Sequence, residues 1–488
     1  MKRVETDVAV IGAGSAGLSA INAARRAGKR VVLIERGEYG TTCARVGCMP
    51  SKLLIAAAEA AHGVREANRF GVLTDDVRID GRAVMARVRQ ERDRFVSFVV
   101  EDVDSFPAHE KITGEAHFVS DTVLSVGNDT EVHAKAVVIA TGSDPVVPDT
   151  FKVLGDRAIV NDDVFDWEEL PRRVAVFGPG VIGAELGQAL ARLGVNVKVF
   201  GENGSLVGLS DPEVRCVAQH AFQKNFYLDP DARVEHVTRD GDEVVITYFN
   251  TRNVKVTEHF DYALIATGRA PNLKALKLEN TSAKLDKKGV PLFDRKSMQI
   301  GKLPIFIAGD VDGDVPFLHE AADEGRIAGD NAARFPDVRC WKRRTPLAIV
   351  FTDPQVAIVG QRFKAVADQD IVIGEVSFED QGRARVMLQN QGLLRVYAQC
   401  GDGLLLGAEM AAPAAEHLGH LLAWAIQQKM TVPQVLDMPF YHPVLEEGLR
   451  TALRDAVKKL KNVRQDREAA PADAEETEES EGDSKKNA

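Results

Sequence analysis

Two cysteines lie five positions apart in the segment GTTCARVGCMPSK, which covers residues 40–52. They are Cys43 and Cys48, and the whole chain of 488 residues holds only five cysteines. Two thiols this close in sequence can bind a metal ion, form a redox-active pair, or be neighbours by chance. The residues around them distinguish these possibilities.

A metal site is disfavoured by the positions of the other cysteines. Structural zinc sites usually combine one close cysteine pair with a second pair of ligands. Here the remaining cysteines, Cys216, Cys340 and Cys400, are scattered along the chain. We therefore expect no metal ligands in this protein.

A redox pair is favoured by the residues that follow the first cysteine. Residues five apart in a regular helix have Cα atoms roughly 8 to 9 Å apart, whereas a disulfide tolerates only about 7 Å. A bond between Cys43 and Cys48 therefore requires a distorted first helical turn, for which Gly47 and Pro50 are suitable. Cys48 is then expected near a helix N-terminus, where its thiolate is stabilised, with the charge of Lys52 one turn later.

A dinucleotide-binding pattern precedes the cysteines. Residues 6–37, TDVAVIGAGSAGLSAINAARRAGKRVVLIERG, read as strand, glycine turn, helix and strand. Gly12 permits the tight turn, Gly14 lets a pyrophosphate approach the backbone, and Gly17 allows the helix to pack closely on the strand. The helix N-terminus favours phosphate, and Glu35 ends the second strand, where an acid can hydrogen-bond a ribose.

The same unit recurs in residues 172–204, RRVAVFGPGVIGAELGQALARLGVNVKVFGENG, where Gly178, Gly180 and Gly183 repeat the glycines at an offset of 166. The repeat predicts two bound dinucleotides; the alternative is one site and a repeat that binds nothing. The position that matches Glu35 is Gly201, and residues 201–209 contain no arginine to hold a 2′-phosphate. We therefore expect NAD rather than NADP.

The rest of the chain completes an α/β architecture. Residues 136–145 and 263–272 each read as an apolar strand that ends in Ala-Thr-Gly, and a later strand ends at Asp310, at the edge where ligands bind in open sheets. From about residue 341 the pattern changes to short strands, hairpins and helices, which predicts a separate α+β domain.

Composition limits the partners. The formal net charge is −11, and residues 465–488 hold nine acids, three bases and no large apolar side chain. We expect this tail to be disordered, and a mildly acidic body disfavours nucleic acid. No signal peptide and no membrane-spanning stretch is visible, so we expect a cytoplasmic protein.

Together with YHPVLEE at residues 441–447, these motifs resemble the FAD-dependent pyridine nucleotide-disulfide oxidoreductases, over about residues 5–460. Within that family the pattern is most similar to the dihydrolipoamide dehydrogenases. The resemblance implies two Rossmann-like domains, for FAD and NAD, and a C-terminal dimerisation domain. The expected boundaries are 1–150 for FAD and the redox disulfide, 151–272 for NAD(P), 273–340 for the remaining central part, 341–462 for dimerisation and 463–488 for the acidic tail.

The resemblance also implies catalytic roles. Cys43 would be the thiol that meets substrate and Cys48 the thiol at the flavin, with Lys52 near the flavin and paired with Glu185. His442 would be the acid–base, oriented by Glu447 and supplied by the partner subunit of a homodimer. A histidine fits this role because it titrates near neutral pH.

The remaining residues expected to contact FAD or the nicotinamide nucleotide are glycines and strand-end residues of the two repeats. With Lys52 and Glu185 they are Gly12, Gly14, Ser15, Ala16, Gly17, Glu35, Thr42, Ala116, Thr141, Gly142, Gly178, Gly180, Ile182, Gly183, Gly268, Asp310 and Leu318.

The implied reaction is oxidation of protein-bound dihydrolipoyl groups with reduction of NAD⁺, on a lipoyl-bearing carrier protein or a 2-oxoacid dehydrogenase complex. Two alternatives stay open: an NADPH-dependent reductase of another disulfide, similar to glutathione reductase, and a diaphorase or electron-transfer flavoprotein that docks to a protein partner. The sequence departs from the family at Arg45, Val444 and Gly201. Arg45, beside the first cysteine, could favour an anionic disulfide.

Overall fold

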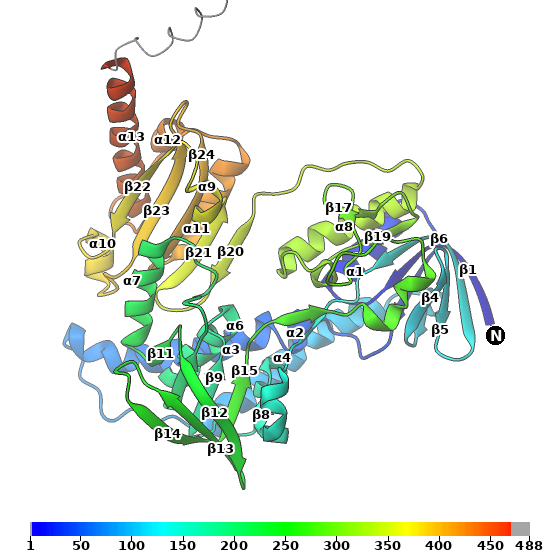
Figure 1. Ribbon diagram of the computed structural model, residues 1–488, viewed down its shortest axis with the longest axis horizontal. Coiled ribbons are helices and arrows are strands. Elements are labelled where there is room, and N and C mark those ends of the chain that lie inside the picture. Colours follow the sequence, from blue (N-terminus) through cyan, green and yellow to red (C-terminus); the bar gives the residue numbers. More distant parts are fainter. Residues whose placement is uncertain (1, 470–488) are drawn as a thin grey trace, which may run out of the picture. The chain divides into compact units, whose positions relative to one another are not determined.

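The computed structural model describes residues 2–469 of the chain, which divide into two compact units (Figure 1). Unit 1 comprises the chain up to Gly208, Phe222–Arg344 and Val350–Thr352. Unit 2 comprises Leu209–Ala221, Thr345–Ile349 and the chain from Asp353. The α/β class predicted from the sequence is confirmed.

Unit 1 contains a nine-stranded sheet whose central strands are parallel. Its main path runs β17 (Phe293–Asp294), β18 (Gln299–Ile300), β19 (Ile305–Ile307), β6 (Thr130–Ile139), β1 (Lys2–Ile11), β2 (Val31–Glu35) and β3 (Lys111–Thr113), and β4 (Ala116–Ser120) and β5 (Val123–Val126) form a hairpin beside β6.

The second half of strand β1, residues 8–11, is apolar on both faces because both faces are covered. Val8 and Val10 pack into one hydrophobic cluster, with α1 (Ser15–Arg26) and α8 (Leu318–Arg334). Ala9 and Ile11 pack into another, with the β4–β5 hairpin. This is the alternation expected of a strand in the middle of a three-layer domain.

The second glycine repeat forms its own parallel sheet in unit 1. The order is β11 (Tyr227–Asp229), β10 (Asn196–Phe200), β9 (Arg173–Phe177), β15 (Tyr262–Ile265) and β8 (Ala158–Ile159), with α6 (Val181–Arg192) after β9. Between β11 and β15, the chain forms an antiparallel sheet of β12 (Arg233–Asp240), β13 (Glu243–Phe249) and β14 (Lys255–Phe260). Strands β7 (Ser143–Pro145) and β16 (Arg269–Pro271), which leave the two Ala-Thr-Gly turns, pair with each other.

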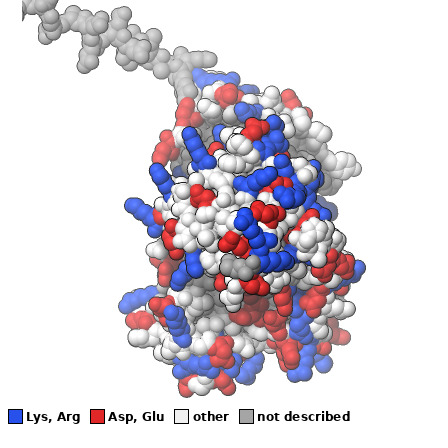
Figure 2. Space-filling model, turned by 90° about the vertical axis from the view of Figure 1, so that its right-hand side faces the viewer, with Lys and Arg blue, Asp and Glu red and all other residues white. Residues whose placement is uncertain are grey.

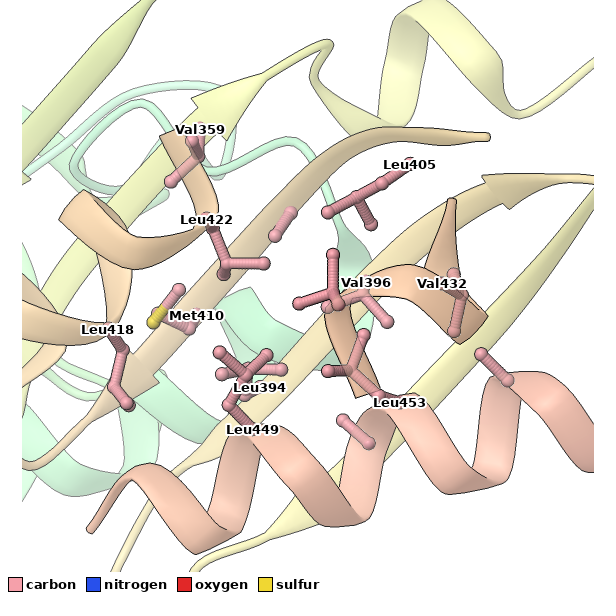
Figure 3. Close-up of a cluster of buried hydrophobic side chains, with 14 of the residues drawn as sticks. Val359, Leu394, Val396, Leu405, Met410, Leu418, Leu422, Val432, Leu449 and Leu453 are labelled. Atoms are coloured by element: carbon pink, nitrogen blue, oxygen red, sulfur yellow. The ribbon is translucent and has the colours of Figure 1, made fainter. Parts of the chain in front are cut away.

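Unit 2 is built on one five-stranded sheet, β20 (Leu347–Val350), β21 (Gln355–Gly360), β24 (Leu405–Ala412), β23 (Leu393–Gln399) and β22 (Ile371–Ser377). Figure 3 shows its core, where Leu394, Val396 and Met410 of the sheet meet helix residues such as Leu418 and Leu453. The helices are α9 (Phe363–Val366), α10 (Gly382–Val386), α11 (Ala415–Gln427), α12 (Val432–Leu436) and α13 (Glu446–Ala469).

Two predicted boundaries are wrong. Leu209–Ala221, expected in the nucleotide-binding domain, belongs to unit 2. The physical reason is a buried polar cluster: Asp211 accepts hydrogen bonds from Arg395 and from the hydroxyl of Tyr397, while the carboxylate of Glu409 accepts from the backbone of Asp211.

The second wrong boundary is the start of the acidic tail. Helix α13 continues to Ala469, beyond the predicted limit of 462. Residues 463–469 are mostly of helix-forming types, which can extend a helix already begun. The remainder of the predicted tail lies outside the described residues.

On the face drawn in Figure 2, basic and acidic side chains are intermingled. Within residues 2–469, no helix combines the length and apolar composition needed to cross a membrane.

Helices α1 and α8 approach so closely that only glycine fits at two contacts. A Cβ on Gly329 would lie 2.1 Å from the carbonyl oxygen of Ala20, and one on Gly325 2.1 Å from that of Ala16. Because both obstacles are backbone atoms, Gly329→Ala should lower the free energy of unfolding by about 2 kcal/mol or more. Urea unfolding of the two forms measures this difference.

Gly63→Ala in α3 (Cys48–Glu66) is the matched control. A Cβ at Gly63 meets nothing within 4 Å, so this change should raise the free energy of unfolding by about 0.5 to 1 kcal/mol through helix propensity. Equal effects of the two substitutions would contradict the packing argument.

Candidate active site

The two cysteines lie on either side of a short break between helices. Cys43 is in α2 (Thr42–Arg45), and Cys48 is the first residue of α3, as predicted. Both are free thiols in this structure, and their side chains are hydrogen-bonded to each other. Cys43 donates the hydrogen bond to Cys48, and this bond together with burial raises the pKa of Cys43. The same bond and the charge of Lys52 lower the pKa of Cys48 to about 7.

Two side chains, one of them from a distant segment, hold this loop by hydrogen bonds. The side-chain amide of Asn161, which is buried, donates to the carbonyl of Val46 at 2.8 Å. The Ser51 hydroxyl donates to the carbonyl of Cys48 at 3.1 Å. Asn161 lies more than a hundred residues away with no motif around it, so the sequence contains no signal for its role.

Lys52 lies between the cysteine loop and helix α6. Its ammonium is 2.7 Å from Oε2 of Glu185, the pairing that was predicted. The Glu185 side chain is only 5% exposed, and its Oε1 accepts a hydrogen bond from the backbone N–H of Phe351 at 2.9 Å. Lys52 also lies 4.7 Å from the centre of the Phe351 ring. Phe351 is therefore a member of the site that the sequence did not identify.

Arg45 does not stand free beside the first cysteine. Its guanidinium donates to the carbonyl of Tyr39 at 2.7 Å and forms an ion pair with the carboxylate of Glu38. The Tyr39 carbonyl carries no net charge, so only the Glu38 carboxylate offsets the charge of this guanidinium. That offset weakens the case for Arg45 as a cation that attracts an anionic disulfide.

The first glycine repeat has the shape that a dinucleotide needs. Gly12 has a φ of +104°, and a Cβ there would lie 2.3 Å from the carbonyl oxygen of Ala140, so only glycine fits. A Cβ on Gly14 meets nothing within 4 Å, which leaves the turn open to a ligand. Gly14 is also the N-cap of α1 and gives it no side-chain cap, so the N–H groups of the first turn face outward. The residues present therefore fit the pyrophosphate of FAD.

Glu35 lies at the end of β2, as predicted. Its carboxylate accepts hydrogen bonds from the backbone N–H groups of Ala13, at 2.7 Å, and Gly37, at 2.9 Å. These bonds fix the acid beside the glycine turn. Gly17 packs α1 against that turn, since a Cβ there would lie 1.8 Å from the carbonyl oxygen of Gly12.

Asp310 is positioned near the same turn. Its carboxylate accepts a hydrogen bond from the hydroxyl of Ser143 at 2.9 Å. The preceding residue, Gly309, packs against the Ala16 side chain and donates its N–H to Glu324 at 2.9 Å. Burial raises the pKa of Glu324 to about 8.

The other residues predicted to contact FAD lie at the starts of helices and strands or in turns. Ser15 and Ala16 begin α1, Thr141 borders the Gly12 turn, Gly142 has a φ of +67°, Leu318 begins α8, Ala116 begins β4, and Thr42 begins α2.

The second glycine repeat reproduces the first in detail. Gly178 has a φ of +103°, and a Cβ there would lie 2.4 Å from the carbonyl oxygen of Ala266. Gly180 is open and is the uncapped N-cap of α6, while Gly183 packs against Gly178. Ile182 follows within the first turn of α6, and Gly268 lies after β15 with a φ of +132°.

His442 and Glu447 form a pair within unit 2. The Nδ1 of His442 lies 2.9 Å from Oε2 of Glu447, and the histidine side chain is 80% exposed. Burial opposes ionisation of Glu447, but hydrogen bonds from His442 and from the Val444 N–H lower the pKa of Glu447 overall. In the described part of the chain Nε2 has no partner, so this nitrogen is available to exchange a proton.

The pKa of Cys48 gives a direct prediction for the reduced holoenzyme. Alkylation of Cys48 by iodoacetamide, followed by peptide mass spectrometry, should rise with pH through a midpoint near 7. Lys52→Met should move that midpoint upward, because the lost positive charge stabilises the thiolate. Lys29→Met, at an exposed position, should leave it unchanged. A midpoint near the ordinary thiol value of about 8.5 would refute the assignment.

The chain matches known families over most of its length. Residues 6–325 match the pyridine nucleotide-disulphide oxidoreductase family, and residues 347–453 match the dimerisation domain of that family. Dihydrolipoyl dehydrogenase from Geobacillus stearothermophilus is 28% identical, over 91% of this chain and 94% of that enzyme. Mercuric reductase from Shigella flexneri is 31% identical, over 93% of this chain and 82% of that enzyme.

Solved structures agree with this assignment. LpdA from Mycobacterium tuberculosis is 26% identical and superposes with a TM-score of 0.79, over 93% of this chain and 99% of that chain. The flavoprotein disulfide reductase RclA from Escherichia coli, 23% identical, has the same fold with a TM-score of 0.76, over 93% of this chain and 99% of its own. Family members bind FAD and a nicotinamide nucleotide. The chain belongs to the FAD-dependent pyridine nucleotide-disulfide oxidoreductases.

Proposed function

We propose that this enzyme oxidises protein-bound dihydrolipoyl groups and reduces NAD⁺. The carrying observation is the hydrogen-bonded pair of Cys43 and Cys48, with a low pKa at Cys48 only. Such a pair can be oxidised to a disulfide by two electrons and reduced again by a dithiol. The dihydrolipoyl dithiol loses two electrons and two protons; NAD⁺ gains a hydride, and one proton is released.

The first step is thiol–disulfide exchange. In the oxidised enzyme, a dihydrolipoyl sulfur attacks Cys43, and Cys48 leaves as a thiolate because its pKa is low. The second lipoyl sulfur then displaces Cys43, which closes the lipoyl disulfide. His442 takes the proton of the attacking thiol at Nε2, while Glu447 holds Nδ1 and stabilises the charged ring.

The chain's own residues prepare Cys48 for the second step. The ammonium of Lys52 stabilises the thiolate, and Glu185 and the ring of Phe351 fix that ammonium in place. FAD would be held by the first glycine turn, Glu35 and Asp310, and when bound it supplies the two-electron relay between the thiols and NAD⁺.

The ion pair of Arg45 with Glu38 supports a lipoyl substrate over an anionic disulfide. A site for a substrate such as glutathione disulfide gains from free cations that pair with its carboxylates. Arg45 is the cation nearest to Cys43 in sequence, and Glu38 already occupies it. A lipoyl group on a carrier lysine presents two sulfurs and an uncharged chain, which requires no such cation.

A homodimer completes the proposal. The matched dimerisation domain supports it, and unit 2 exposes large apolar side chains, with Trp424 66% and Tyr441 80% exposed. Exposed large apolar side chains often mark a surface that another protein covers, and we propose that a second copy covers these. The exposed His442 would then serve the cysteine pair of the partner.

The test is a spectrum and one assay. The purified protein should be yellow, and it should form NADH rapidly from dihydrolipoamide and NAD⁺. Rapid oxidation of NADPH by glutathione disulfide, with no dihydrolipoamide turnover, would favour the alternative reductase. Reduction of artificial dyes by NADH, without turnover of either disulfide, would favour the diaphorase.

Cys48→Ser should leave FAD bound but lower dihydrolipoamide turnover to nearly zero, because the exchange then has no leaving thiolate. Absorbance near the flavin maximum measures retention of FAD, and NADH formation measures turnover. Cys216→Ser, an exposed cysteine outside the site, is the control and should retain full activity. Substantial turnover by the Cys48 variant would refute the scheme.

His442→Gln should lower kcat for dihydrolipoamide by about a hundredfold or more, the usual contribution of a general acid–base. Glu447→Gln should have a smaller effect, since the imidazole remains. NADH oxidation by an artificial dye does not require exchange at the cysteines, so both variants should retain it. Loss of the dye reaction as well would indicate a structural role instead.

A further inference from the structure

The turn after β10, residues 201–204, lies beside the second glycine turn. The end of β2 has the same place beside the first glycine turn. The N–H of Gly178 donates to the carbonyl of Phe200 at 2.8 Å, and the N–H of Gly12 donates to that of Ile34 at 2.8 Å. Position 201 therefore occupies the place of Glu35, which in such units faces the adenosine ribose.

Packing excludes an acid from position 201. A Cβ on Gly201 would lie 2.6 Å from Cγ of Pro179 and 2.8 Å from the carbonyl oxygen of Pro230. Pro179 also corresponds to Ala13, whose N–H holds the Glu35 carboxylate in the first unit. Proline has no N–H, so the Pro179–Gly201 pair removes both the acid and the hydrogen bond that would orient it.

Negative charge is present at this turn in another form. Glu202 is exposed, and it has no ion-pair or hydrogen-bond partner for its side chain among residues 2–469. The N–H of Asn203 donates to the carboxylate of Asp231 at 3.1 Å, and that of Asp231 to the carboxylate of Asp229 at 3.2 Å. Three acids thus surround the turn, and within the described chain no cation forms an ion pair with any of them.

The nearest cation along the chain is already engaged. Arg233 follows the acidic turn directly, but its guanidinium lies 3.5 Å from Glu235 and 4.2 Å from the centre of the Phe249 ring. The turn therefore keeps a net negative charge where the 2′-position of an adenosine ribose is expected.

We propose that this chain selects NAD⁺ over NADP⁺ through the unpaired charge of Glu202, reinforced by Asp229 and Asp231, and not through a carboxylate bonded to the ribose. The inference rests on the proposed nucleotide site in the second repeat. NADP⁺ differs from NAD⁺ by a 2′-phosphate that carries nearly two negative charges at neutral pH, and like charges repel. Salt screens this repulsion between charges, whereas it would not change a preference that arose from a steric clash with the 2′-phosphate.

The experiment measures binding of NAD⁺ and NADP⁺ to the oxidised holoenzyme by titration calorimetry, so that no redox reaction takes place. The wild-type enzyme should bind NAD⁺ more tightly, and the ratio of the two Kd values should fall as salt rises from 10 mM to 500 mM. Glu202→Lys should lower the ratio by at least about threefold at low salt. Glu202→Gln removes one charge instead of reversing it, so it should have about half that effect on a logarithmic scale. It also provides a second test if the lysine variant does not fold.

Asp240→Lys is the matched control. Asp240 is exposed and ends β12, about 23 Å from Arg233 along the strand. That distance exceeds the screening length of about 10 Å at 100 mM salt, but not the length of about 30 Å at 10 mM. The same charge reversal there should leave the ratio unchanged at 100 mM salt, and at 10 mM it should change the ratio much less than Glu202→Lys does.

Three outcomes would overturn the proposal: tighter binding of NADP⁺ by the wild-type enzyme, a ratio that does not respond to salt, or a ratio unchanged by either Glu202 substitution. The readout contains no disulfide substrate. An enzyme with the expected selectivity that fails to oxidise dihydrolipoamide would retain this inference and refute the proposed substrate.

Discussion

The ion pair between Lys52 and Glu185 is the contact on which the candidate site depends. It joins the helix that begins at Cys48 to the helix that begins at the second glycine turn. Glu185 is almost fully buried, and a buried carboxylate is costly unless it is paired and hydrogen-bonded. Lys52 and the N–H of Phe351 meet that need, and the lysine charge is thereby fixed near the thiol whose pKa it lowers.

The two glycine repeats show how one local design is used for two tasks. Both have a left-handed first glycine, an open second glycine and an uncapped helix N-terminus. They differ at the ribose end, where the first has Glu35 bound to two backbone N–H groups and the second has Gly201 packed against Pro179. The two repeats therefore share the backbone geometry at the expected phosphate end. They differ in the side chains at the expected ribose end.

Much of this could be predicted because the signals are local. Strand, glycine turn and helix follow one another within about thirty residues, and Cys48 stands directly before a helix-forming run. Asn161 and Phe351 could not be predicted, since they reach the site from distant segments. Asn161 does so through one hydrogen bond, and Phe351 through one hydrogen bond and its ring. The assignment of Leu209–Ala221 to unit 2 depends in the same way on long-range contacts of Asp211 and Glu409.

The departures from the family pattern are understood only with their neighbours. Arg45 alone suggests affinity for an anion, yet Glu38 and the Tyr39 carbonyl engage its guanidinium. Gly201 alone suggests a lost nucleotide contact, yet Pro179 fills the space that a side chain would take, and Glu202 places an acid one residue later. In each case a second residue changes what the first implies, because charge and volume act through contacts. The unit to compare between relatives is therefore the contacting pair, not the single position.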